Sequence, residues 1–149
     1  MIAGVNPRRF DDFFAAFDAR WFGGIVPAWR SANGRAPAFT DAVYVAYLSY
    51  YLLPIGVALL ARRRGEEVYE RAAFAILLCF YASYAGYLAF PTAGPRLSPE
   101  DEARLLGGGA VSEGARAFLH VAERTRLDAF PSGHTAIALL VLFLSYRYA

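Results

Sequence analysis

Two long apolar stretches dominate the pattern of hydrophobic and polar positions along the chain. Residues 42–61 and 72–90 carry no charged side chain, and each is close to the roughly 20 residues that a helix needs to cross a bilayer. The pattern therefore predicts two membrane-spanning helices. Pro54 lies inside the first of them and is expected to kink it, since prolines are tolerated in spanning helices.

A third apolar run lies at the C-terminal end of the sequence. Residues 135–146 are free of charge before Arg147, and at about 1.5 Å per residue they cover roughly 18 Å of a bilayer core of about 30 Å. A helix that starts near Pro131 is longer and comes closer to the thickness of the bilayer core. At its other end the Arg147 side chain can extend to the far interface. We therefore expect 131–149 to begin a third span, in a chain cut at or just after it.

The segment before the first span has the pattern of an interfacial helix. After Asn6 and Pro7, which favour a helix start, aromatic side chains recur at helical spacing on one face. They are Phe10, Phe13, Phe14, Phe17 and Trp21. This face either lies at headgroup level or packs against the spanning helices, and the pattern leaves both open.

These patterns together predict an all-α protein, a polytopic transmembrane helical bundle within a single membrane domain. Its expected parts are an interfacial segment at 1–41, spans at 42–61 and 72–90, an extracytoplasmic loop with short helices at 91–130, and the partial span at 131–149. One of the short helices is expected to run from about Glu113 to Arg124 and to carry His120.

Composition supports the membrane assignment and removes other classes. Hydrophobic residues make up 57% and aromatic residues 16% of 149 residues, which is too apolar for a typical soluble domain and far from disorder. All 15 basic residues are arginine, as expected of a high-GC bacterial gene. They are spread over the loops, so no nucleic-acid partner is expected. The single cysteine, Cys79, excludes an intramolecular disulfide and a cysteine-based metal site.

The arginines also predict the orientation of the chain. Arg62, Arg63, Arg64 and Arg71 crowd the short connection between the two spans, which the positive-inside rule assigns to the cytoplasm. The other connections hold more arginines in total, but these are interleaved with acids. We therefore expect a bacterial inner-membrane protein whose 91–134 region faces the periplasm or the exterior.

The tetrapeptide Pro131-Ser132-Gly133-His134 is the strongest chemical signal. Pro131 suits a first helical turn, Ser132 suits a helix cap, and Gly133 lets a ligand approach the backbone. Backbone N–H groups at a helix N-terminus attract an anion such as phosphate, and His134 can exchange a proton near neutral pH. The alternative is a capped helix start with a surface histidine.

A second candidate phosphate ligand is Arg96. It ends the stretch Phe-Pro-Thr-Ala-Gly-Pro-Arg at 90–96, in which two prolines and a glycine restrict the backbone just outside the second span. A guanidinium binds phosphate oxygens in a bidentate manner. The alternative is an arginine that reaches the membrane interface. His120 is interpreted as a surface or packing histidine, since no residue at matching spacing completes a metal set.

These motifs resemble a known family. Residues 130–135, Phe-Pro-Ser-Gly-His-Thr, resemble the second signature of the type 2 phosphatidic acid phosphatase superfamily. Residues 87–97, with Gly94-Pro95-Arg96, are more similar to the branch that contains inositol phosphorylceramide synthases, as are residues 18–29 and the tyrosine-rich first span. The first signature of the superfamily has a lysine and an arginine-proline pair, whereas this chain has no lysine and has Pro95-Arg96.

The resemblance implies a mechanism without metal or cofactor. In the family a histidine of a third signature, oriented by an aspartate, attacks phosphorus and forms a phosphohistidine; that signature is absent from residues 1–149. The resemblance assigns His134 the protonation of the departing alkoxide. Arg96 and the amides around Ser132 and Gly133 would stabilise the charge on the phosphoryl oxygens.

Three functions follow as hypotheses. The first is a phosphatase or phosphotransferase that acts on a lipid phosphate or phospholipid, with water or an alcohol as acceptor. The second is a headgroup transferase similar to inositol phosphorylceramide synthase. The third is a non-catalytic membrane module that binds phosphate or assists assembly, which applies if 149 residues are the whole protein.

Overall fold

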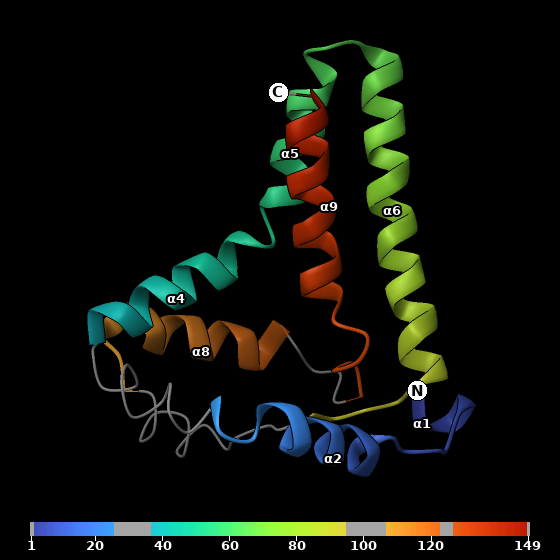
Figure 1. Ribbon diagram of the computed structural model, residues 1–149. Coiled ribbons are helices and arrows are strands. Elements are labelled where there is room, and N and C mark those ends of the chain that lie inside the picture. The colour runs from blue at the N-terminus through green and yellow to red at the C-terminus, as the bar shows by residue number, and fades with distance from the viewer. Residues whose placement is uncertain (1, 26–36, 95–106, 123–126, 149) are drawn as a thin grey trace.

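The computed structural model of the chain describes residues 2–25, 37–94, 107–122 and 127–148 (Figure 1). Its helices are α1 (Ile2–Val5), α2 (Asp11–Phe22), α4 (Pro37–Ser49), α5 (Leu53–Arg62), α6 (Glu66–Ala89), α8 (Ala110–Ala122) and α9 (Gly133–Tyr148). Within these residues all regular elements are helices, which confirms the predicted all-α class. Residues 95–106 of the loop in which short helices were expected lie outside the described residues.

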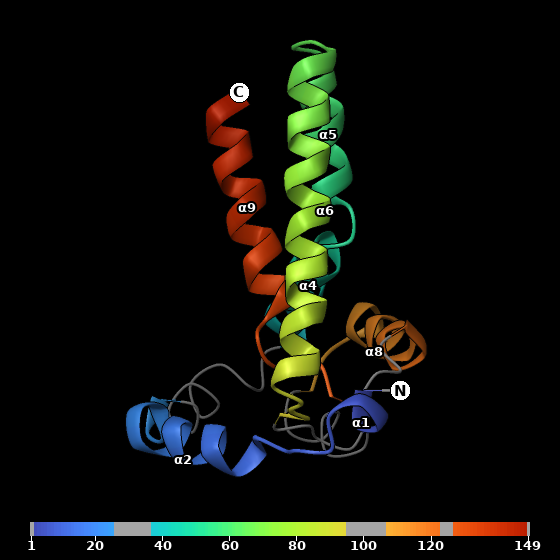
Figure 2. The ribbon, with the colours of Figure 1, turned by 90° about the vertical axis from the view of Figure 1, so that its right-hand side faces the viewer.

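Three helices stand side by side and enclose the main core. Figures 1 and 2 show α5, α6 and α9 upright, with the C-terminal end of α9 close to the turn between α5 and α6. Their shared interior is lined by small and branched apolar side chains. These are Val57, Ala61, Ala72, Ile76, Ile137, Val141 and Leu144. The alanines near the α5–α6 turn let the helices approach closely, as small residues do in membrane bundles.

The outer faces of the upright helices are apolar and exposed. Phe74 of α6 is 67% exposed and Leu142 of α9 is 67% exposed, and both belong to a larger set of outward-facing apolar side chains. Among the described helices, α6 alone is long and apolar enough to cross a membrane, and the pair α4 and α5 also passes if the two count as one bent span. The polytopic bundle itself stays a prediction.

The segment expected to form one span at 42–61 is divided into two helices. The axes of α4 and α5 differ by 49° across a short break. Pro54 lies in the first turn of α5, where it lacks an N–H to donate and its ring would clash with the carbonyl of Tyr50 in a continuous helix. The N–H of Leu52 instead donates to the carbonyl of Ser49 at 2.9 Å, which tightens the end of α4. The kink predicted from Pro54 is therefore a full break just before it.

The second apolar helix begins earlier than the charge pattern predicts. α6 starts at Glu66 rather than residue 72 and has 24 residues, about 36 Å at the usual rise. Glu66 and Glu67 occupy its first turn, where carboxylates interact favourably with the helix dipole. Ion pairs from Arg62 to Glu66 and from Arg71 to Glu67 accompany this start. The charged residues therefore extend the helix instead of ending it.

Helices α4 and α8 form a second pair, which lies obliquely at the end of the bundle away from the α5–α6 turn (Figure 1). Asp41 of α4 accepts hydrogen bonds from the N–H groups of Gly109 and Ser112, both at 2.9 Å. Arg116 of α8 lies 5.5 Å from the ring centre of Tyr44. Because Asp41 satisfies N–H groups at the start of α8, this helix begins three residues before the predicted Glu113.

Candidate active site

The loop that follows α6 lies beside the loop that leads into the tetrapeptide. Thr92 and Asp128 form an isolated parallel β-bridge, and the N–H of Ala129 donates to the carbonyl of Thr92 at 3.0 Å. A β-carbon added to Gly94 would come within 2.8 Å of the Ala129 side chain. We call these stretches, residues 90–94 and 127–131, the paired loops. They follow α6 and precede α9, so residues 90–94 and the tetrapeptide are at one end of the bundle.

The tetrapeptide forms the N-terminal cap of α9. Ser132 Oγ accepts a hydrogen bond from the N–H of Thr135 at 3.2 Å, and the Ser132 carbonyl accepts one from Ala136 at 3.0 Å. The cap predicted at Ser132 is therefore present. Pro131 does not occupy the first turn as predicted, because the helix begins at Gly133 and the proline precedes the cap.

Two glycines allow this cap to dock against α6. A β-carbon on Gly86 would overlap the ring of Pro131, and a β-carbon on Gly133 would overlap the hydroxyl of Tyr87. The Tyr87 hydroxyl therefore lies directly against the Gly133 backbone. The close approach of the α9 start to α6 therefore depends on the absence of side chains at both positions.

The His134 side chain faces the break between α4 and α5. Its ring is stacked against Tyr47, with centroids 4.8 Å apart and planes 23° apart, and lies 4.1 Å from the ring of Tyr50. Together these rings border an open groove of about 420 Å³. The other lining residues are Ala46, Leu53, Thr135, Ala138, Leu139 and Leu142. The imidazole thus lies at the side of a mainly apolar groove.

The N-terminal segment contacts both of the paired loops. The ring of Phe10 lies 5.4 Å from Phe90 and the ring of Phe14 lies 4.2 Å from Phe130, whereas Trp21 on the same helix is 64% exposed. Phe10 and Phe14 therefore pack against the paired loops, whereas Phe13, Phe17 and Trp21 are exposed. A position of this face at headgroup level stays a prediction.

Asp11, the first residue of α2, accepts hydrogen bonds from the N–H groups of Ala93 and Gly94. Burial alone raises the pKa of this carboxyl, but these two amides and the guanidinium of Arg9 outweigh it and hold the pKa below the usual 3.8. A carboxyl whose pKa is lower in the folded than in the unfolded protein stabilises the fold at any pH above its pKa in the unfolded chain. The stabilisation by Asp11 is therefore present at neutral pH and is lost as the pH falls through its lowered pKa.

The remaining candidate residues are Arg96, Ser132, Gly133 and His120. Arg96 lies outside the described residues. The phosphate-binding roles of Ser132 and Gly133 stay predictions, and in the structure Ser132 Oγ accepts the capping hydrogen bond of α9. His120 is exposed on α8. Within the described parts of the chain, no three histidine, cysteine or carboxylate side chains are grouped as metal ligands would be.

Sequence reasoning missed three contributors to this region. No role in the site was predicted for Tyr47 or Tyr50, although their spacing of three residues puts them on one helix face. The third, Asp11, has no local sequence signal, because its partners at 93–94 lie far along the chain.

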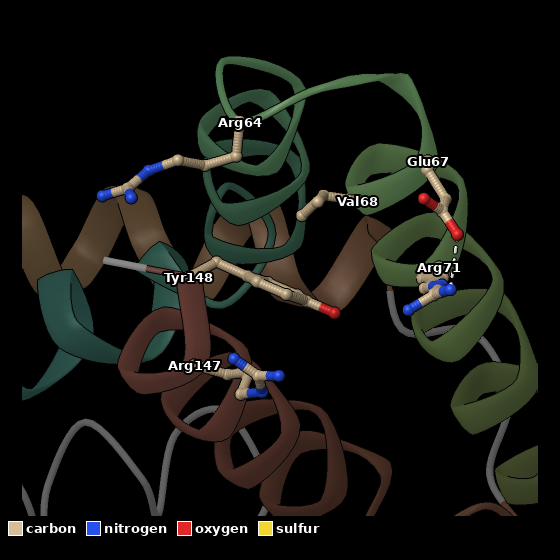
Figure 3. Close-up of a pocket in the computed structure, with 6 residues that line it drawn as sticks. All are labelled: Arg64, Glu67, Val68, Arg71, Arg147 and Tyr148. Carbon is tan, nitrogen blue, oxygen red and sulfur yellow. Dashed lines mark hydrogen bonds and ion pairs between the residues drawn. The ribbon is translucent and has the colours of Figure 1, made fainter.

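A second hollow lies at the opposite end of the bundle. It has a volume of about 290 Å³ and is lined by Arg64, Glu67, Val68, Arg71, Arg147 and Tyr148 (Figure 3). Glu67 and Arg71 form an ion pair within α6, and Arg147 comes from the last turn of α9. The arginines of the α5–α6 turn and of the α9 end therefore gather at one end, away from the paired loops.

The comparisons with known proteins identify the family. The family model described as the PAP2 superfamily matches residues 12–149 of the chain. The chain belongs to this superfamily, as the resemblance predicted. No curated protein and no solved structure matches the chain.

Proposed function

We propose that this protein is a membrane lipid-phosphate phosphatase or phosphotransferase that acts through a phosphohistidine intermediate. Membership of the PAP2 superfamily supports a phosphatase or phosphotransferase activity on a phosphate-bearing substrate. The observation that carries the proposal furthest is the position of His134, at the capped start of α9 and at the side of an apolar groove.

In this proposal the groove holds the apolar chain of the lipid. Leu53 of α5 and Leu139 and Leu142 of α9 offer apolar walls next to the imidazole. A lipid whose chain lies in the groove would have its headgroup phosphate at the membrane surface, at the end of the bundle where α9 begins. Binding sites of this kind are mostly apolar with few polar groups that orient the ligand.

His134 is the proposed general acid, which protonates the departing alkoxide. Its contacts with the rings of Tyr47 and Tyr50 limit rotation of the imidazole and so favour a fixed direction of proton transfer. Arg96 and the backbone around Ser132 and Gly133 are the proposed phosphate ligands. The paired loops support this assignment, because Gly94 lies against Ala129 and Arg96 follows Gly94 by two residues.

The nucleophile is the remaining requirement. The sequence contains two histidines, His134 and the exposed His120. Neither of them belongs to the family's third signature, which is absent from residues 1–149. In the proposed mechanism the nucleophile is the histidine of that third signature. Activity is therefore to be measured on the protein expressed from its complete reading frame.

The acceptor distinguishes the two enzyme hypotheses. Gly94-Pro95-Arg96 resembles the inositol phosphorylceramide synthase branch and so favours transfer to an alcohol. We expect purified protein to release diacylglycerol and inorganic phosphate from phosphatidic acid in EDTA. If an alcohol acceptor competes with water, diacylglycerol is still released, but part of the phosphoryl group is expected to appear as the phosphorylated alcohol instead of inorganic phosphate. Phosphate release unchanged by inositol or other alcohols supports the phosphatase; no turnover with any acceptor contradicts both hypotheses.

The proposed orientation puts the paired loops at the periplasm or the exterior of a bacterial inner membrane. Arg62, Arg63 and Arg64 lie at the α5–α6 turn, and Arg147 of α9 adds to the same end of the bundle (Figures 1 and 3). A concentration of arginine at one end supports a cytoplasmic position for that end.

Cysteine labelling tests this orientation. In a Cys79→Ala background, Ala129→Cys is expected to react with a membrane-impermeant maleimide in intact cells, whereas Arg63→Cys is expected to react only after the cells are opened. Ala129 and Arg63 are both exposed, so accessibility to solvent does not separate them. The reverse labelling pattern would contradict the orientation.

A further inference from the structure

The hollow at the α5–α6 turn combines polar groups from two helices. Glu67 and Arg71 come from the first two turns of α6, and Arg147 and Tyr148 come from the last turn of α9. In Figure 3 the Arg147 guanidinium and the Tyr148 hydroxyl are directed from α9 toward Arg71, whereas the Arg64 side chain extends away from them. Two guanidinium groups and a hydroxyl, all hydrogen-bond donors, therefore line one small space.

The charges in this space leave a positive charge without compensation. Glu67 forms an ion pair with Arg71, and both side chains are mostly exposed. Exposed pairs of this kind stabilise a fold only weakly, so Arg71 can also bind a second anion. Arg147 adds a further positive charge to the same hollow. A singly charged phosphodiester fits this balance, because a guanidinium binds phosphate oxygens in a bidentate manner.

Exposed aromatic side chains adjoin this space toward the middle of the bundle. Phe74 follows Arg71 by three residues and Phe143 precedes Arg147 by four, so each ring lies on the same helix face as its arginine. Phe74 is 67% exposed and Phe143 is 61% exposed. A free phosphate ion would gain nothing from these rings, whereas the acyl chains of a lipid would cover them and remove their apolar surface from water.

We propose that the hollow between the α5–α6 turn and the end of α9 binds the phosphate group of an anionic membrane lipid. Arg71, Arg147 and Tyr148 donate to the phosphodiester, and the acyl chains lie against Phe74 and Phe143. The inference rests on the membrane insertion in the proposed function, and in the proposed orientation the lipid belongs to the cytoplasmic leaflet. Basic pockets between spanning helices on that side of a membrane bind anionic headgroups. The site is separate from the paired loops, which lie at the other end of the bundle (Figure 1).

Lipid binding to the purified protein tests this site. Native mass spectrometry in detergent, on protein expressed from its complete reading frame, is expected to show tighter binding of dioleoylphosphatidylglycerol than of zwitterionic dioleoylphosphatidylcholine. Arg147→Gln is expected to weaken phosphatidylglycerol binding about tenfold, the order for loss of a charge-assisted hydrogen bond. Glu67→Gln is expected to tighten it about fivefold, the order for one unit of charge at a membrane surface. A folding defect would not produce this tighter binding.

Arg63→Gln is the matched control, because Arg63 is an exposed arginine of the same turn that does not line the hollow. It removes the same charge and is expected to leave binding nearly unchanged. Equal weakening by Arg63→Gln, an unchanged affinity in Arg147→Gln, or equal binding of the two lipids would overturn the site. Displacement of phosphatidylglycerol by millimolar inorganic phosphate would show a site for the free ion and overturn the lipid assignment.

Turnover of phosphatidic acid by the same proteins separates this inference from the proposed function. Arg147→Gln is expected to retain turnover, because Arg147 lies at the opposite end of the bundle from the paired loops. Protein that binds phosphatidylglycerol through Arg147 but has no turnover contradicts the proposed function and supports this inference. Protein with turnover whose lipid binding does not depend on Arg147 overturns this inference alone.

Discussion

Replacement of His134 by alanine is expected to lower kcat for a lipid phosphate about 10³-fold while membrane insertion and helix content are retained, since a positioned general acid contributes typically 10²–10⁴. The imidazole lies beside Tyr47 and Tyr50 at the side of the groove rather than in the main core. The loss is therefore expected in turnover more than in stability. Phosphate release from phosphatidic acid measures it directly.

The leaving group provides a sharper form of this experiment. A p-nitrophenolate leaves without protonation, so p-nitrophenyl phosphate is expected to lose much less activity than phosphatidic acid in His134→Ala. His120→Ala is the control, because His120 is the other histidine of the sequence and is exposed on α8. Full turnover of phosphatidic acid by His134→Ala, or an equal loss for both substrates, would contradict the role of general acid.

Gly86→Ala is expected to destabilise the protein by about 1–3 kcal/mol, the usual cost of an overpacked interior site. Its β-carbon would overlap the ring of Pro131, which is rigid and cannot move aside as a flexible side chain does. The start of α9 would have to shift from α6, and His134 would shift with it. Both the unfolding midpoint in detergent and kcat are therefore expected to fall.

Gly56→Ala is the matched control for this substitution. Gly56 is an exposed glycine within α5, and a β-carbon added there meets no atom within 4 Å. Because alanine is favoured over glycine in a helix by roughly 0.5–1 kcal/mol, Gly56→Ala is expected to be neutral or stabilising. Equal stability of the two variants would show that the approach of α9 to α6 is not as close as described.

The sequence predicts those features that depend on local pattern. The apolar runs locate α6 and the start of α9, Ser132 identifies the cap, and the motif around His134 identifies the superfamily, which the family match confirms. The break before Pro54 was predicted only as a kink, because a proline marks a weak point and does not decide how far the chain turns.

Features that depend on distant pairs could not be predicted. The bridge from Thr92 to Asp128 and the contact from Asp11 to Ala93 join residues far apart in the chain, and no periodicity encodes them. The early start of α8 has the same cause, since its capping carboxylate comes from Asp41 in another helix. Local patterns identified the motifs of the site, and these tertiary contacts determine how the motifs meet.

The most direct test of the proposed function is to trap the phosphoenzyme. Protein expressed from its complete reading frame is mixed with ³²P-labelled phosphatidic acid in EDTA and quenched in alkali during turnover. A phosphohistidine is stable in alkali and labile in acid, so we expect labelled protein that loses its label on acidification. Turnover without labelled protein, label that resists acid, or the absence of both turnover and label would contradict a phosphohistidine mechanism for this protein.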